Sequence, residues 1–102
     1  MAYRLRFVQR FDKKDMDIFL ELERKFIEWE KSAEGIVPGR RFVPVSGRDP
    51  VNTLIYEADV PEMEDVMALM RAIDADEGHS ALVEQQGIYM KDYYVEILRE
   101  LQ

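Results

Sequence analysis

Residues 40–61 read RRFVPVSGRDPVNTLIYEADVP, and this stretch decides the fold. β-Branched and aromatic residues lie on both sides of a Ser-Gly-Arg-Asp-Pro turn at residues 46–50, which predicts a β-hairpin. Pro44 has no backbone N–H to donate to a neighbouring strand, so the first strand of the hairpin is expected at an edge of the sheet. The second strand has apolar side chains on both faces, which favours a central position covered on both sides.

Residues 3–11 (YRLRFVQRF) alternate between two faces, which predicts a strand with one core face and one polar face. The core face carries Tyr3, Leu5, Phe7 and Phe11, and the other carries Arg4, Arg6, Val8 and Arg10. Asp12 stands where a helix N-cap belongs. We therefore expect a first helix from about Lys13 to about Ala33, ended by Gly35.

Two carboxylates interrupt the apolar stripe of this helix. The stripe consists of Met16, Phe19, Leu20, Leu22, Phe26 and Ile27. Glu23 and Glu30 are seven residues apart, so they stack one above the other on the side that faces the sheet. A carboxylate there is costly unless it is paired, hydrogen-bonded or exposed to a wet cavity. Either both residues point into a ligand pocket, or they bend to the helix edge or pair with an arginine.

The second half of the chain predicts two more helices and a last strand. Asp59-Val60-Pro61-Glu62 indicates a cap with proline at the first helical position, so the second helix is expected from about Pro61 to Ala75. Its three methionines, Met63, Met67 and Met70, indicate either an adaptable core or a pocket wall. A short helix around residues 76–86, stopped by Gly87, and a strand around residues 94–98 follow. For that strand, Tyr94 and Leu98 compete with Val95 and Ile97 for the buried face.

The element order is strand, helix, strand, strand, helix, strand, which is the split βαβ arrangement called ferredoxin-like. The predicted fold is therefore α+β, a four-stranded antiparallel sheet with two helices on one face. The short extra helix comes before the last strand. The first and third strands are expected in the centre of the sheet. At 102 residues the chain is expected to form one domain, residues 1–102, with a modest core.

Composition and charge narrow the classes of partner. The net charge is −7, and residues 57–77 alone hold eight acids against one base, Arg71. Such a surface disfavours nucleic acid, because binding it depends on neutralising phosphates. No apolar run approaches the roughly 20 residues that span a membrane. The chain has no cysteine, which excludes disulfides and thiolate sites, and its start shows no secretory pattern. We expect a cytoplasmic protein.

Three runs add to the element order: RFVPVSG at residues 41–47, DVPEMED at 59–65 and YVEIL at 94–98. Together they resemble the dimeric α/β-barrel superfamily of ferredoxin-like proteins, and within it the NIPSNAP-type and antibiotic-biosynthesis-monooxygenase-type domains. The resemblance implies a homodimer whose two sheets pack face to face, with the helices outside. It also implies a pocket between sheet and helices that works without cofactor or metal. No catalytic residue is transferred, because neither Asn52 nor Trp29 lies in a matching motif.

The polar faces of the first and third strands bear on the predicted dimer. The face with Arg6 and Val8 and the face with Ile55 and Glu57 should lie side by side on neighbouring strands. Such a strip is too apolar for open water and too charged for a dry core. A partly wet dimer interface with Arg–Glu pairing would satisfy it. The alternative is a monomer with one solvated sheet face.

The leading functional hypothesis is a small-molecule pocket between the first helix and the sheet, with Glu23 and Glu30 pointing into it. Its apolar walls are expected from Tyr3, Phe7, Tyr56 and Met70. A buried carboxylate tends to have a raised pKa, which suits a general acid or base near neutral pH.

Two further residues are candidate ligand contacts. Arg41 belongs to a small basic patch with Arg40 and Arg48, which either grips an anionic substrate or neutralises nearby acids or a partner chain. His79 is the only histidine, and its acidic surroundings suggest a metal site but fail the spacing of a calcium-binding EF-hand loop. The simpler interpretation of His79 is an exposed loop residue.

The predicted function is binding of a small hydrophobic molecule. A cofactor-independent, monooxygenase-like reaction is its enzymatic form, and a non-catalytic ligand-binding or homodimeric assembly domain is the alternative. The predicted ligand-binding residues are Glu23, Glu30, Tyr56, Arg41 and His79. No metal and no cofactor is predicted, and whether the chain is an enzyme stays open.

Overall fold

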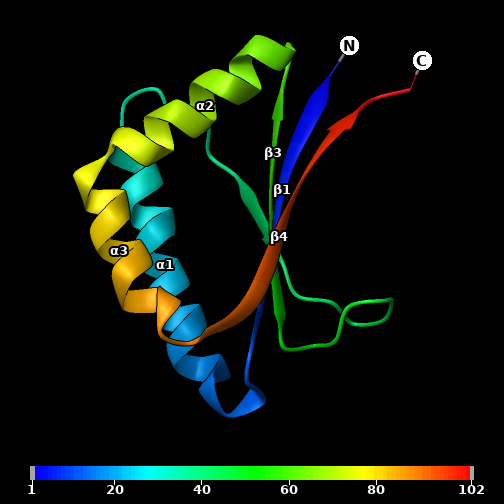
Figure 1. The fold of residues 1–102 in the computed structure, drawn as a ribbon, viewed down its shortest axis with the longest axis vertical. Helices are drawn as coiled ribbons and strands as arrows, with labels where there is room; N and C mark the ends of the chain where they lie inside the picture. Colours follow the sequence, from blue (N-terminus) through cyan, green and yellow to red (C-terminus); the bar gives the residue numbers. More distant parts are fainter. Residues whose placement is uncertain (1, 102) are drawn as a thin grey trace.

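The computed structural model describes residues 2–101, and its elements follow the predicted order. The first half contains β1 (Tyr3–Phe11), the 3-10 turn η1 (Lys13–Asp15), α1 (Met16–Ser32) and β2 (Arg40–Phe42). The second half contains β3 (Thr53–Val60), α2 (Met63–Ala75), α3 (Glu77–Gly87) and β4 (Met90–Arg99). The predicted ferredoxin-like α+β fold is confirmed, including the extra helix before the last strand (Figure 1).

The four strands form one antiparallel sheet in the order β2-β3-β1-β4. Leu5 in β1 stands opposite Ala58 in β3 on one side and Ile97 in β4 on the other. The prediction that β1 and β3 are central and β2 and β4 are edges is therefore confirmed. β2 ends at Phe42, before Pro44, as expected because proline cannot donate to the ladder.

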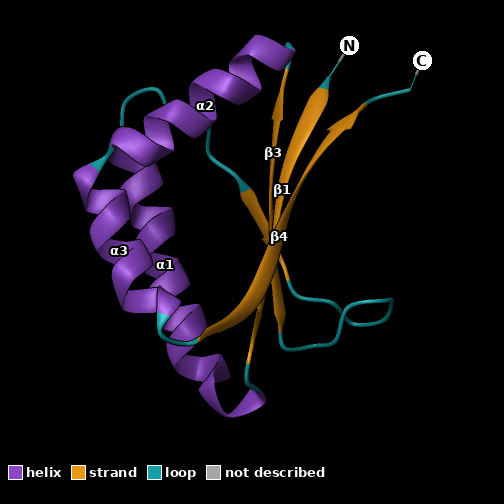
Figure 2. Ribbon diagram, viewed as in Figure 1, coloured by secondary structure: helices purple, strands orange, loops and turns teal. Residues whose placement is uncertain are grey.

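All three helices lie on one side of the sheet, and the connection between β2 and β3 lies on the other (Figure 2). On that second side the Tyr94 hydroxyl donates a hydrogen bond to Asp49 Oδ2 at 3.2 Å, and Arg48 donates one to the Tyr94 hydroxyl. The connection is thus tied to β4. Val8, which lies on this side between Ile55 and Tyr94, is buried.

The buried apolar residues form two separate clusters beneath the helices. The larger one consists of Leu5, Tyr56, Ala58, Val60, Val66, Leu69 and Ile73, which join the sheet to α2. The smaller one consists of Phe11, Phe19 and Leu54, and the two phenylalanine rings stack with their centroids 4.4 Å apart. Phe19 anchors the first half of α1 to the sheet through the smaller cluster, whereas α2 is anchored through the larger one.

Both predicted helix starts differ from the observed ones. α1 begins at Met16, because residues 13–15 form a 3-10 turn and the Asp12 side chain makes no capping hydrogen bond. α2 begins at Met63 and is capped by Glu62, whose backbone N–H donates to Asp65 Oδ2 at 3.0 Å. The predicted placement of Pro61 at the first helical position is wrong, since β3 continues to Val60 and delays the turn into the helix.

The methionines of α2 do not form a pocket wall. Met63 and Met67 are exposed, and Met70 packs against the larger apolar cluster. The buried residues of α2 are Val66, Leu69 and Ile73. No helix among residues 2–101 is long and apolar enough to span a membrane.

Strand pairing decides which side chains of β4 face the helices, a point that the sequence did not settle. Val95 stands opposite Phe7 and Ile97 opposite Leu5, so both are on the helical side of the sheet. Tyr94 is on the far side with Val8. Val95 and Ile97 nevertheless stay exposed, because α2 packs on the central strands β1 and β3 and leaves this edge uncovered.

Candidate functional site

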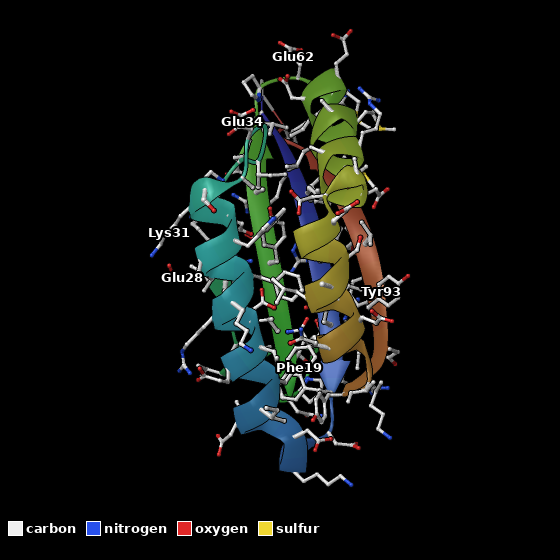
Figure 3. The ribbon with its side chains drawn as sticks, turned by 90° about the vertical axis from the view of Figure 1, so that its left-hand side faces the viewer. Phe19, Glu28, Lys31, Glu34, Glu62 and Tyr93 are labelled. Atoms are coloured by element: carbon white, nitrogen blue, oxygen red, sulfur yellow. The ribbon has the colours of Figure 1, made fainter. Side chains whose placement is uncertain are left out.

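A cavity of about 750 Å³ lies between the helices α1 and α3 and the sheet. Its wall includes Phe7, Arg41, Tyr56, Tyr93 and Val95 from the strands and Glu23, Phe26, Trp29, Glu30, His79, Val83 and Gln86 from the helices. Figure 3, viewed from the helical side, shows the central strands in the space between α1 and α3. The volume is within the range of sites that bind small molecules.

The two carboxylates of α1 meet at one guanidinium in this cavity. Glu23 and Glu30 are only 7% and 6% exposed. Arg41 Nε donates to Glu23 Oε2 at 2.8 Å, while Arg41 Nη1 and Nη2 donate to the two oxygens of Glu30 at 2.7 Å each. The alternative of pairing with an arginine is confirmed, and both carboxylates also line the cavity. We call these three residues the carboxylate–arginine triad.

The backbone and an aromatic ring hold Arg41 in place. Arg41 stands opposite Tyr56 in the sheet, and its guanidinium carbon lies 4.8 Å from the centre of the Tyr56 ring. The backbone N–H of Gly39 donates to Glu30 Oε2 at 3.4 Å. A Cβ on Gly39 would lie 2.0 Å from a Tyr56 ring carbon, so only glycine lets the chain pass this close.

Gln86 joins the third helix to the triad, and it is a cavity residue that the sequence analysis did not single out. It is the one buried residue of α3. Its Nε2 donates to Glu23 Oε1 at 2.9 Å and to the backbone oxygen of Phe19 at 3.3 Å. No sequence signal marked it, because a glutamine before a helix-ending glycine has the appearance of an ordinary solvent-exposed residue.

The triad carries one negative charge in excess, since two carboxylates face one guanidinium. Burial raises the pKa of Glu23, and the hydrogen bonds from Gln86 and Arg41 oppose that shift. Both oxygens of Glu23 accept N–H donors, which is the bonding of an ionised carboxylate. Burial lowers the pKa of Arg41, but the bonds and charges of Glu30 and Glu23 outweigh it and leave that pKa above its ordinary value.

Tyr56 presents a neutral hydroxyl to the cavity. Burial, followed by the nearby charge of Glu30, raises the pKa of Tyr56 to about 12. The residue is 5% exposed, and its hydroxyl makes no hydrogen bond to another part of residues 2–101. The Tyr56 oxygen is not one of the fully buried side-chain atoms that lack a partner, so it keeps contact with the open cavity and is free to bond with a ligand.

His79 lies in the first turn of α3, so its interpretation as an exposed loop residue is wrong. Asp76 caps this helix, and its Oδ1 accepts both the backbone N–H of His79 and the indole N–H of Trp29, each at 2.9 Å. The half-buried His79 ring lies 5.0 Å from the Trp29 ring and 5.3 Å from that of Phe26. Burial lowers the pKa of His79, and the charges of Asp76, Asp74 and Glu30 only partly oppose the shift.

Comparison with known proteins identifies the fold. No family model matches the sequence, and no curated protein matches it significantly. A NIPSNAP family protein from Agrobacterium tumefaciens superposes with a TM-score of 0.81 at 17% identity, covering 99% of this chain and 94% of that one. An antibiotic biosynthesis monooxygenase superposes with a TM-score of 0.76 at 17% identity, covering 98% and 99%. The chain has the NIPSNAP and antibiotic biosynthesis monooxygenase fold.

A further NIPSNAP domain protein, from Burkholderia xenovorans and uncharacterised, superposes with a TM-score of 0.76 at 14% identity, covering 99% of this chain and 95% of that one. The resemblance inferred from the element order is confirmed at the level of the fold. Identities this low show the fold alone, so the chemistry of the site has to be argued from this chain's own residues.

Within this NIPSNAP-like fold all five predicted site residues line the cavity between α1, α3 and the sheet: Glu23, Glu30, Arg41, Tyr56 and His79. Of the four predicted apolar walls, Phe7 and Tyr56 line it, whereas Tyr3 and Met70 pack against the larger apolar cluster instead. The predicted basic patch is dispersed. Arg40 pairs with Asp59 at 3.5 Å on the other side of the sheet, and Arg48 lies beside Asp49 and Tyr94.

No three side chains of histidine, aspartate or glutamate converge on a metal-sized site within residues 2–101. The cavity residues themselves can form hydrogen bonds, stabilise charge and transfer protons. Glu23 is the group best placed for the last of these, because burial raises its pKa above the ordinary value and it lines the cavity.

Replacing Arg41 with methionine should destabilise the fold strongly. It would leave Glu23 and Glu30 buried without a positive partner, which costs about 3–5 kcal/mol at neutral pH. Urea unfolding followed through the fluorescence of Trp29, the single tryptophan, measures the loss. Arg40→Met is the matched control and should cost less than about 1 kcal/mol, because Arg40 forms an exposed pair. Equal losses in the two variants would contradict the role of the triad.

Acidification should weaken the fold through His79. Its pKa is lower in the folded chain than the ordinary value of 6.5, so the unfolded chain binds more protons between the two pKa values. Stability is therefore lost as the pH falls through 6.5 towards the folded pKa. Relative to His79→Gln, the wild type should lose unfolding free energy over this range. Parallel pH curves for the two proteins, or an imidazole NMR titration at or above the ordinary pKa, would refute the prediction.

Proposed function

We propose that this protein binds a small hydrophobic molecule in the cavity between α1, α3 and the sheet. The observation that carries the proposal is a cavity of about 750 Å³ that combines aromatic walls with a buried ionic group. An opening of this size, with a few convergent polar groups, is typical of a ligand site.

The polar groups are arranged to orient a ligand. The Tyr56 hydroxyl supplies one hydrogen bond that no other described part of the chain uses, and Glu23 supplies an acceptor whose pKa burial raises. The apolar wall around them consists of Phe7, Phe26 and Trp29. A bound molecule would therefore have its apolar body held by rings and one polar end held by the triad or by Tyr56.

The enzymatic form of the proposal is a cofactor-independent, monooxygenase-like enzyme. Its support is the fold shared with a protein named antibiotic biosynthesis monooxygenase, together with Glu23 as a proton acceptor at the cavity wall. The alternative is a protein that binds the ligand without changing it. Glu23→Gln distinguishes the enzyme from the binding protein. In an enzyme the variant would lose turnover of the ligand, whereas in a binding protein only the affinity for the ligand would change.

An uncharged fluorescent probe, N-phenylnaphthylamine, should bind in the cavity and brighten. Trp29 lines the cavity, so bound probe should also quench the tryptophan emission. Val83→Arg places a long side chain at the cavity wall and should weaken binding by about tenfold or more, equal to about 1.4 kcal/mol. Gln85→Arg is the matched control, since it adds the same charge to an exposed position of α3 that does not line the cavity. No brightening in the wild type would refute the proposed function.

We also propose that the chain forms a homodimer through the side of the sheet that faces away from the helices. On this side Arg6 Nε pairs with Glu57 at 2.8 Å, and Arg6 Nη1 pairs with Glu96 at 2.5 Å. Because these charges are already paired within one chain, removing them from water when a second chain packs on the sheet costs less free energy. Phe42 and Leu98, on the two edge strands, are each 44% exposed on this side. This side of the sheet thus has paired charges on its central strands and apolar residues on its edge strands, which suits contact with a second copy of the chain.

Replacing Leu98 with lysine should shift the protein from dimer to monomer, because it puts an unpaired charge where the second sheet would pack. Sedimentation equilibrium over a range of protein concentrations measures the shift. Met67→Lys is the control, since Met67 is an equally exposed apolar residue on α2, and it should leave the dimer intact. A wild-type chain that sediments as a monomer at all concentrations would overturn the proposal.

A further inference from the structure

The excess negative charge of the carboxylate–arginine triad is not balanced by the rest of the cavity wall. Lys91 lines the mouth, but its Nζ pairs with Asp12 at 3.2 Å. Asp92 lines the mouth as well and pairs with Arg10 at 2.5 Å. Asp74 adds a further carboxylate to the lining. The two rim pairs are neutral, so the surplus of negative charge in the cavity comes from the triad and from Asp74.

The imidazole of His79 does not supply the missing positive charge at neutral pH, since burial lowers its pKa. Tyr56 is neutral as well. Without a ligand, the excess charge has no positive partner and is stabilised by the neutral N–H donors of Gln86 and Gly39 and by water at the open side, and a buried charge without a counter-ion is costly.

Arg41 has almost no hydrogen-bonding capacity left for a ligand. Its Nε donates to Glu23, its Nη1 to Glu30 and to the backbone oxygen of Gly39, and its Nη2 to Glu30. Four of its five N–H groups are therefore in use. An anionic ligand would gain little from this guanidinium and would approach two buried carboxylates, whose repulsion is strong in an apolar site.

The same walls suit a positive charge. The carboxylate of Glu23 accepts two hydrogen bonds, out of about four that a carboxylate can accept, so it can take another donor. The Tyr56 ring is already covered by the Arg41 guanidinium and by Phe7, but the rings of Phe7, Phe26 and Trp29 line the cavity as well. Aromatic faces attract cations, and the unpartnered hydroxyl of Tyr56 can accept an N–H bond.

We propose that the ligand of this cavity is a hydrophobic amine, an apolar body that carries one protonated nitrogen. The ammonium group neutralises the excess charge of the triad and donates to Glu23 or to the Tyr56 hydroxyl. The apolar body contacts the rings of Phe7, Phe26 and Trp29. The inference rests on the proposed function, because it names the chemical class of molecule that the same cavity takes.

Three probes with one apolar body test the charge preference directly. Phenylbutylamine, phenylbutanol and phenylbutanoate are positive, neutral and negative at neutral pH, and each is titrated against protein loaded with N-phenylnaphthylamine. The amine should displace the fluorescent probe at about tenfold lower concentration than the alcohol, and the acid should be weakest. An alcohol or acid that displaces it as well as the amine would overturn the inference while the proposed function stands. Failure of N-phenylnaphthylamine itself to bind would overturn the proposed function and the inference with it.

A variant pair assigns the preference to the triad. Glu23→Gln removes the excess charge, so the ratio of amine to alcohol affinity, measured within that variant, should fall by about tenfold. Glu28→Gln makes the same chemical change on the same helix, where Glu28 points away from the cavity and pairs with Lys31 (Figure 3), and should keep the wild-type ratio. An amine preference that survives Glu23→Gln would refute the role given to the triad. If Glu23→Gln does not fold, the wild-type probe series decides the inference alone.

Discussion

The pairing of two buried carboxylates with one guanidinium is the interaction on which the rest of this site depends. Glu23 and Glu30 occupy positions of α1 that would otherwise hold core side chains, and either carboxylate alone would be very costly to bury. Arg41 makes the arrangement stable and comes from the short edge strand β2. The triad therefore ties the first helix to the edge of the sheet with polar bonds instead of apolar packing.

This replacement of apolar packing explains where the cavity lies. α2 buries Val66, Leu69 and Ile73 against the central strands, and only its C-terminal end, at Ile73 and Asp74, reaches the cavity. α3 buries only Gln86, which bonds to Glu23 and to the backbone of α1. The second helix thus stabilises the sheet, while the third covers a space that the polar groups of the first helix keep open.

The two sides of the sheet are charged in different ways. On the side away from the helices each arginine of β1 has an acidic partner on a neighbouring strand, for example Arg4 with Asp59 at 2.8 Å. On the helical side Arg41 pairs with both Glu23 and Glu30, so one negative charge has no positive partner. Paired charges favour contact with another protein surface, whereas an uncompensated charge in an apolar cavity favours a small ion or a charged ligand.

The sequence by itself determined the element order, the edge position of β2 and the burial of Glu23 and Glu30, because strand alternation and helical periodicity depend only on residue spacing. Only the tertiary structure decided which partners those carboxylates meet. Arg41 is 18 residues from Glu23 and Gln86 is 63 residues from it, and no local pattern reports contacts over such separations. The burial of His79 and the exposure of Met63 likewise depend on where α3 and α2 pack, which is decided by the whole chain.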